Sequence, residues 1–202
     1  MRTKGIQSLQ KAGLMAVVGV LLLGLLPLVI ETAEAESLSE MESPGSIEFV
    51  GKNAFVTANG RFHTWRVVES EVDLAALSES FALIEVDLSS IDTGINRRDN
   101  HLRNPDFFDV ERYPVAVARV HSARPKGETE AGRPLFLARF DIDLHGVQKT
   151  VEGEVVLLDE DPLAFEGSLA IDRMEFGVGK APNRWNPMSV KAEIQLHFRV
   201  EL

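Results

Sequence analysis

Cysteine is absent from this chain of 202 residues. The absence excludes a disulfide scaffold, a thiolate-ligated zinc or iron–sulfur site, a cysteine nucleophile and a lipidated cysteine anchor. Basic residues are also scarce, with 21 Lys and Arg against 31 Asp and Glu, so that the formal net charge is −10. We therefore expect no nucleic-acid partner, because phosphate binding requires clustered basic side chains.

Recognisable catalytic and metal-binding spacings are missing as well. The five histidines form no His-x-His or His-x-x-x-His pair, and no serine lies in a G-x-S-x-G context. The acidic run at residues 159–161 lacks the ligand spacing of a calcium loop. These observations predict a protein that is not an enzyme and that needs no metal or other cofactor. A rival interpretation makes an acid–base site from Arg98, Asp99 and His101.

The N-terminal part of the chain has the organisation of a secretory signal. Three basic residues precede an uncharged apolar run over residues 12–30, and a small-residue pattern follows at residues 33–35. This order predicts a signal peptide over residues 1–35, and hence a periplasmic or secreted protein. The alternative is an N-terminal membrane anchor, because the apolar run of 19 residues is close to the ~20 that span a bilayer as a helix. Residues 36–45 are polar, and we expect them to form a flexible lead-in to one domain over residues 46–202.

Alternation of apolar and polar residues dominates the rest of the chain. Within residues 139–145, Phe140, Ile142 and Leu144 fall on one face, while charged residues and His145 fall on the other. This period of two predicts half-buried antiparallel strands, because successive side chains of a strand point to opposite faces. The same reasoning predicts strands over residues 46–51, 54–58, 61–72, 82–88, 114–121, 150–158, 165–171 and 193–200. Several short strands without a long helical period are typical of a sandwich or a closed barrel.

A segment dense in charge, residues 89–114, contains the adjacent rings of Phe107 and Phe108. We interpret it as a structural plug, in which the charged side chains satisfy turn backbone groups and each other. The two rings are then expected to cover an apolar end of the domain. Acid–base or metal chemistry in this segment would need a further ligand or nucleophile that the spacing does not supply.

Three other side chains have alternative roles. Arg98 and Arg173 are expected to pair with Asp92 or Asp99, because Arg–carboxylate pairs are common fasteners of loops. The alternative is that either arginine meets the head group of a ligand. Trp185 lies in an irregular stretch, and three roles are open for it: a lid over a ligand pocket, contact with a partner or a membrane interface, or packing under a loop. The sequence does not choose among these roles.

Three motifs follow one another along the chain. The first reads Ser90-Ile91-Asp92-Thr93-Gly94, Arg98-Asp99-x-His101-Leu102-Arg103, Asp106-Phe107-Phe108-Asp109 and Tyr113-Pro114. The second reads Asp143-Leu144-His145-Gly146-Val147-x-Lys149, and the third reads Ile171-Asp172-Arg173-x-x-Phe176-Gly177. Together they resemble the signature of the YceI-like family over about residues 46–202, with Asp172 where Asn is usual.

This resemblance implies a lipocalin-like antiparallel β-barrel of about eight strands, with one or two short helical turns. It also implies export, and a lipid-binding function in which the barrel interior holds or carries a polyisoprenoid, an isoprenoid quinone or another long-chain amphiphile. Such a ligand needs a long apolar cavity, since apolar burial contributes about 25 cal/mol per Å². No catalytic residue is implied, and a homodimer is consistent with the family. The expected ligand-binding residues are Phe49, Phe62, Ile84, Val86, Leu102, Phe107, Phe108, Phe140, Ile142, Leu144, Phe165, Leu169, Phe176, Leu196 and Phe198.

Departures from the family pattern leave an alternative open. The first half of the domain is short, Ala118 stands where the family tends to have Phe, and residues 177–189 lack the usual pattern. Gly153 and Gly167 are expected to leave room in the barrel wall. The alternative is a ligand-free barrel, filled by its own side chains, that acts as an envelope stress or protein-interaction module. Membrane contact is expected only if the leader is retained.

Overall fold

The computed structural model describes residues 43–183 and 185–202. The predicted signal peptide over residues 1–35, and residues 36–42 of the predicted lead-in, lie outside the described residues. The α-helix α1 spans Asn96–Arg103, and 3-10 turns span Leu88–Ser90 and Arg173–Phe176. The strands are β1 (Gly45–Lys52), β2 (Thr57–Phe62), β3 (Trp65–Glu71), β4 (Phe81–Asp87), β5 (Ile91–Asp92), β6 (Val115–Glu128), β7 (Pro134–Leu144), β8 (Val147–Glu160), β9 (Leu163–Asp172) and β10 (Glu193–Glu201).

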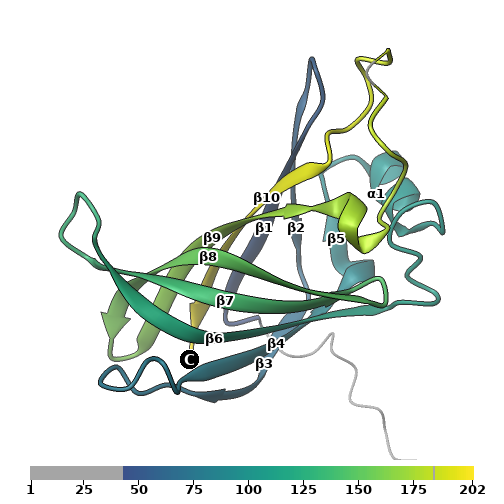
Figure 1. The fold of residues 1–202 in the computed structure, drawn as a ribbon. Coiled ribbons are helices and arrows are strands. Elements are labelled where there is room, and N and C mark those ends of the chain that lie inside the picture. The colour runs from purple at the N-terminus through teal and green to yellow at the C-terminus, as the bar shows by residue number, and fades with distance from the viewer. Residues whose placement is uncertain (1–42, 184) are drawn as a thin grey trace, which may run out of the picture. The chain divides into compact units, whose positions relative to one another are not determined.

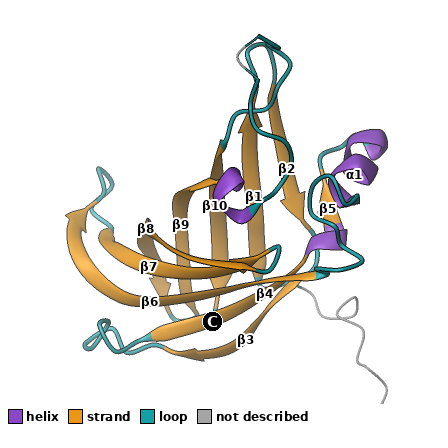
Figure 2. Cartoon of the chain, turned by 45° about the vertical axis from the view of Figure 1, so that its right-hand side comes forward, coloured by secondary structure: helices purple, strands orange, loops and turns teal. Residues whose placement is uncertain are grey.

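These strands form one ten-stranded sheet in the order β3-β4-β6-β7-β8-β9-β10-β1-β2-β5. Every pair of neighbours is antiparallel. The sheet curls strongly, so that its inner face surrounds the apolar core (Figures 1 and 2). The all-β class and the curled antiparallel architecture predicted from the sequence are confirmed, with ten strands in the sheet where about eight are expected.

The strand that no predicted stretch covers is β5, which lies in the segment predicted to be a plug, and the predicted strand over residues 61–72 is divided between the end of β2 and β3. β2 ends at Phe62 next to β5 at one edge of the sheet, and β3 begins at Trp65 at the opposite edge. The three peptide links from Phe62 to Trp65 span at most about 11 Å. The chain therefore crosses from one edge of the sheet to the other in two residues, and this crossing holds the two edges close together at this point.

The predicted strand over residues 54–58 also differs from the structure, because β2 begins only at Thr57. Asn53 turns the chain before that point. Its side-chain oxygen accepts hydrogen bonds from the backbone amides of Phe55 at 2.8 Å and Val56 at 2.7 Å. Asparagine favours turns for this reason, since its short side chain satisfies nearby backbone donors.

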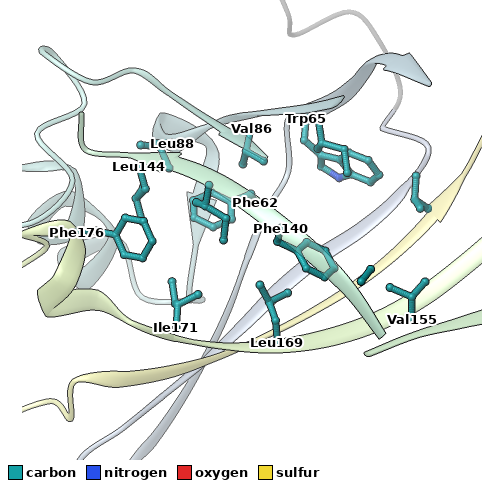
Figure 3. Packing of buried hydrophobic residues seen from close by; sticks show 14 of the residues in the cluster. Phe62, Trp65, Val86, Leu88, Phe140, Leu144, Val155, Leu169, Ile171 and Phe176 are labelled. Atoms are coloured by element: carbon teal, nitrogen blue, oxygen red, sulfur yellow. The ribbon is translucent and has the colours of Figure 1, made fainter. Parts of the chain in front are cut away.

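The core follows the predicted alternation. On β7, Ala138, Phe140, Ile142 and Leu144 are buried, whereas Arg139 between them is exposed. Figure 3 shows part of the resulting apolar cluster, with side chains from several strands facing one another across the interior. One face of β7 is thus buried and the other is exposed, which is the arrangement expected of an antiparallel sheet with a single core.

The segment predicted to be a structural plug contains α1 and the turns after it, beside the sheet (Figure 1). Phe107 and Phe108 both pack against the core, and the ring of Phe108 lies 6.2 Å from the ring of Phe62. Arg103 donates a hydrogen bond of 2.7 Å to the backbone oxygen of Ile91. These contacts agree with the plug interpretation. Within residues 43–183 and 185–202, no helix has the length and apolarity needed to cross a bilayer.

Candidate functional site

The inner face of the sheet and the segments that cover one end of it enclose a cavity of about 820 Å³. This volume is within the range of about 300–1,000 Å³ that is typical of small-molecule sites. The walls come from β1, β2, β4, β6, β7, β9 and β10. The cover comes from α1 and from residues of the segments 106–108 and 178–190.

Most of the predicted ligand-binding residues lie in the wall of this cavity. The structure thus brings together apolar side chains from the two ends of the domain and from the plug. The residues concerned are Phe49, Phe62, Ile84, Val86, Leu102, Phe107, Phe108, Phe140, Ile142, Leu144, Leu169, Leu196 and Phe198.

Two of the predicted residues, Phe165 and Phe176, do not line the cavity. Phe165 is buried on β9, where its register partners on the adjacent strands are Leu157 and Val200. Phe176 is fully buried in the 3-10 turn Arg173–Phe176, and Figure 3 shows it beside Leu144. Both side chains belong to the packed core, which alternation alone does not distinguish from a cavity wall.

The wall glycines do not widen the cavity as the sequence suggests. A Cβ atom at Gly153 would lie 2.8 Å from the ring of Phe140, and one at Gly167 would overlap the ring of Phe198. The two rings lie 5.8 Å apart and occupy the space that the glycines leave. The small side chain of Ala118 on β6, by contrast, does line the cavity, between wall residues of β4 and β7.

Polar side chains gather at the covered end of the cavity. Lys52, Arg98, His101 and Lys180 are basic groups at this end, and Asp106 is an acidic one; we call these five residues the polar rim. The lining also includes the buried Arg173, and His197 of β10. The Lys180 Nζ atom lies 3.5 Å from the Asp106 Oδ2 atom, which leaves an excess of positive charge. This excess is opposite in sign to the net charge of the chain.

The sequence suggests a lid at Trp185 but does not predict that two loops together complete this end. Asn53 and Val56 of the β1–β2 turn line the cavity together with Asn183, Asn186 and Met188 of the segment before β10. The two loops lie far apart in the sequence, and no local motif links them. Only the pairing of β1 with β10 brings them side by side.

Arg98 does not pair with a carboxylate, contrary to the prediction. Its Nε and Nη2 atoms donate to the hydroxyl and the backbone oxygen of Thr93, each at 2.7 Å. The buried Asp99 accepts hydrogen bonds from the backbone amide of Thr93 at 2.9 Å and from its hydroxyl. His101 is exposed and packs edge-on against Phe107, with ring centroids 4.9 Å apart. Asp99 and His101 therefore lie in different environments and do not form the acid–base pair of the rival interpretation.

Arg173 is likewise bonded to backbone oxygens where a carboxylate is predicted. Its guanidinium donates to the oxygens of Val178 at 2.6 Å, Lys180 at 2.8 Å, Val190 at 2.9 Å and Lys191 at 3.0 Å. Burial lowers the pKa of this guanidinium, because the charged form loses contact with water. A guanidinium in a protein nevertheless keeps its proton, so Arg173 remains a donor to both ends of the cover segment.

Trp185 is exposed on the loop beside the cavity, so the interpretation in which it packs under a loop is wrong. The arrangement as a whole suits non-covalent binding of an amphiphile, with apolar walls for a chain and the polar rim for a head group. Among the residues that the structure describes, no three His, Asp or Glu side chains cluster closely enough to hold a metal ion.

Comparison with known families gives a match that includes the whole of the described part. A family model described as YceI-like domain matches residues 41–202. A UPF0312 protein from Pseudomonas fluorescens is 30% identical over 123 residues, covering 56% of this chain and 62% of the relative, which is less than two thirds of its length. A UPF0312 protein from Vibrio campbellii is 29% identical over 141 residues, 68% of this chain and 71% of the relative. One from Pseudomonas savastanoi is 27% identical over 188 residues, 85% of this chain and 93% of the relative.

Solved structures share the fold. BcnA from Burkholderia cenocepacia has a TM-score of 0.68 at 23% identity, covering 81% of this chain and 97% of that chain. A polyisoprenoid binding domain from Saccharophagus degradans, implicated in plant cell wall breakdown, has a TM-score of 0.55 at 17% identity, covering 77% and 91%. A YCEI protein from Campylobacter jejuni has a TM-score of 0.56 at 20% identity, covering 71% and 82%.

Proposed function

This chain belongs to the YceI-like domain family, and we propose that it is an exported protein that binds a polyisoprenoid, an isoprenoid quinone or another long-chain amphiphile in its interior. The observation that carries the proposal is the apolar cavity of about 820 Å³ with the polar rim at one end. The structural neighbour from Saccharophagus degradans, a polyisoprenoid binding domain, supports this class of ligand.

The energy of binding would come mainly from the apolar chain. Burial of about 300 Å² of ligand surface against the cavity wall contributes about 7.5 kcal/mol, before the entropic cost of association. The polar rim, including Lys52 and Arg98, then favours a head group that accepts hydrogen bonds or carries negative charge. Quinone carbonyls, phosphates and carboxylates share this property, so the rim orients the ligand without restricting it to one head group.

Native mass spectrometry of the protein incubated separately with a polyprenol, a ubiquinone and palmitate tests the proposal. We expect an adduct with the mass of at least one of these probes. The variant Ala118→Phe places a ring in the cavity between β4 and β7, and we expect it to reduce adduct formation at least about tenfold, because overpacking displaces the ligand.

The matched control is Ala170→Phe, the same substitution at an exposed position on the outer face of β9. It should form the adduct as the wild type does. A folded wild-type protein that forms no adduct with any of the three probes contradicts the proposal and favours the ligand-free interaction module.

Export is the part of the proposal supported by the sequence of residues 1–35. Intact-mass measurement of the protein from the host's soluble envelope fraction tests it. A mass that corresponds to a chain beginning at Glu36 is expected. Recovery of only the uncleaved chain, in the membrane fraction, contradicts this part and supports an anchor.

A further inference from the structure

Exposed apolar side chains are concentrated on two neighbouring loops. Of the seven large apolar side chains that are exposed in the described part, four lie there. Phe55 and Val56, on the β1–β2 turn, are 72% and 47% exposed, and Trp185 and Met188, before β10, are 79% and 57% exposed. We call these four residues the two-loop tip. A concentration of exposed apolar groups on a protein surface marks an interaction site.

Hydrogen bonds hold the two loops in this presentation. Asn53 accepts hydrogen bonds from the backbone amides of Phe55 and Val56 on its own loop. Its side-chain nitrogen donates to the backbone oxygen of Met188 on the other loop at 3.4 Å. The amide of Ala54 donates to the oxygen of Pro187 at 3.1 Å. The loops are therefore joined as one unit, and these hydrogen bonds hold the backbone so that the side chains of the tip remain exposed.

The two-loop tip adjoins the mouth of the cavity. Val56 and Met188 are exposed on one side and line the cavity on the other. In Figures 1 and 2 the β1–β2 hairpin extends beyond the neighbouring strands, and the loop before β10 runs beside it. A long apolar ligand that passes between the cavity and its surroundings at this end would pass the tip.

The charge of these segments is opposite to that of the rest of the chain. Residues 51–62 and 176–192 contain no Asp or Glu, although the whole chain has 31. Their basic residues are Lys52, Arg61, Lys180, Arg184 and Lys191. Asp92 faces Arg61 and Asp106 faces Lys180, so the positive charge next to the tip comes from Lys52 and Lys191, whose backbones are hydrogen-bonded to each other. A local positive charge on an acidic protein is the condition for attraction to an anionic surface.

We propose that the two-loop tip inserts into the surface of a bilayer that contains anionic lipid. Aromatic and long apolar side chains are favoured at the interface between water and hydrocarbon, and nearby Lys and Arg add attraction to anionic head groups. Insertion of Phe55 and Trp185 would place the cavity mouth at the membrane, where an isoprenoid can enter without crossing water. This consequence rests on the proposed function, whereas membrane contact by the tip does not.

Tryptophan fluorescence tests the proposal on the protein as recovered from its host. Trp185 reports on the tip, because the other tryptophan, Trp65, is only 3% exposed and lies in the core. Vesicles of equal parts phosphatidylglycerol and phosphatidylcholine should shift the emission to shorter wavelength. Bromine atoms on the acyl chains of the same lipids should quench it. Vesicles of phosphatidylcholine alone should bind more weakly.

Variants separate the tip from other surfaces. The double substitution Phe55→Ser, Met188→Ser should weaken vesicle binding about tenfold or more, because binding scales with the apolar area that enters the bilayer. The matched control Val68→Ser, Leu74→Ser removes two exposed apolar side chains elsewhere and should bind as the wild type does. Ala118→Phe should also bind vesicles normally, so failure of cavity binding and failure of membrane contact are distinguishable.

An unchanged Trp185 emission with anionic vesicles overturns the proposal, as does vesicle binding that is insensitive to Phe55→Ser, Met188→Ser. An emission shift that appears only with lipid-free envelope protein assigns the tip to a protein partner. A shift that depends only on the concentration of the protein itself assigns it to a second copy of this chain. Either of these two results also overturns the membrane proposal.

Discussion

Arg173 connects the sheet to the cover of the cavity through a single side chain. It lies in the 3-10 turn after β9, and its guanidinium donates to oxygens of Val178 and Lys180 on one side and Val190 and Lys191 on the other. A hydrogen bond to a charged group contributes about 1.5–3 kcal/mol to stability. One arginine therefore shapes the loop that carries half of the two-loop tip.

Asp141, on the outer face of β7, contributes to stability in a way that depends on pH. A hydrogen bond of 2.6 Å from the Thr150 hydroxyl lowers the pKa of this carboxyl below its ordinary value of 3.8. Desolvation has a smaller effect that raises the pKa, and His121 lowers it further. A lowered pKa in the folded state means that the carboxylate stabilises the fold above its unfolded pKa. That contribution is lost as the pH falls through the lowered value.

We therefore expect Asp141→Asn to show a smaller loss of stability than the wild type between about pH 5 and about pH 2. The difference should be only a few tenths of a kcal/mol, because the carboxylate is 49% exposed and solvent screens the interaction. Urea unfolding at several pH values measures it. Glu166→Gln, on the outer face of β9, is the control and should follow the wild type. Identical acid profiles for Asp141→Asn and the wild type would show that the hydrogen bond has no such effect.

The strands of the wall use glycine to accommodate aromatic rings. On β9, Gly167 lies opposite Phe198 of β10, whose ring covers the position where a side chain would stand. On β1, Gly51 has more space, since a Cβ atom there would lie 3.4 Å from the Ile194 Cδ1 atom, an ordinary contact. The two positions share a residue type but differ in what surrounds them.

Gly167→Ala should lower the free energy of unfolding by about 1–3 kcal/mol, because the added methyl group forces the Phe198 ring or the β8 backbone to move. Gly51→Ala should change it by no more than about 0.5 kcal/mol. Denaturant titration of both variants measures the difference. Equal stabilities for the two variants would contradict the view that the ring fixes Gly167.

At the scale of the whole domain, the interior divides into a filled end and a hollow end. Trp65, Val155, Leu157, Phe165 and Val200 are buried but do not line the cavity, and Figure 3 shows Trp65 and Val155 together at one end of the cluster. The filled end supplies the close packing that stabilises the fold. The hollow end lacks that packing, so that a ligand is expected to restore it.

Ligand binding should consequently raise the thermal midpoint. At a free concentration one hundred times its Kd, a ligand that binds only the folded state contributes about 2.7 kcal/mol, or about 5–10 °C for a domain of this size. Differential scanning fluorimetry with the probe identified by mass spectrometry measures this shift. At the same ligand concentration the shift should fall to about half or less in Ala118→Phe and stay unchanged in Ala170→Phe. A shift of equal size in Ala118→Phe would place the ligand outside the cavity.

The sequence by itself determined the properties that depend on residue type and on periods along the chain. Alternation over residues such as 139–145 places Phe140 and Leu144 on a buried face wherever the strand lies in the sheet. The plug is also predictable from residue type, because the adjacent rings of Phe107 and Phe108 in a charged segment need an apolar surface to pack against. Family motifs then narrowed the all-β class to a lipocalin-like barrel of about eight strands, and the structure shows one curled sheet of ten.

Only the tertiary structure decided which buried residues face a cavity and which polar groups surround it. Phe165 and Phe140 have the same alternation, yet only Phe140 lines the cavity, because packing depends on neighbours from other strands. Arg98 donates hydrogen bonds to Thr93, and Arg173 donates to backbone oxygens, because the fold decides which hydrogen-bond acceptors lie nearest to each guanidinium. The two loops of the tip meet because β1 pairs with β10, a long-range contact that no local pattern encodes.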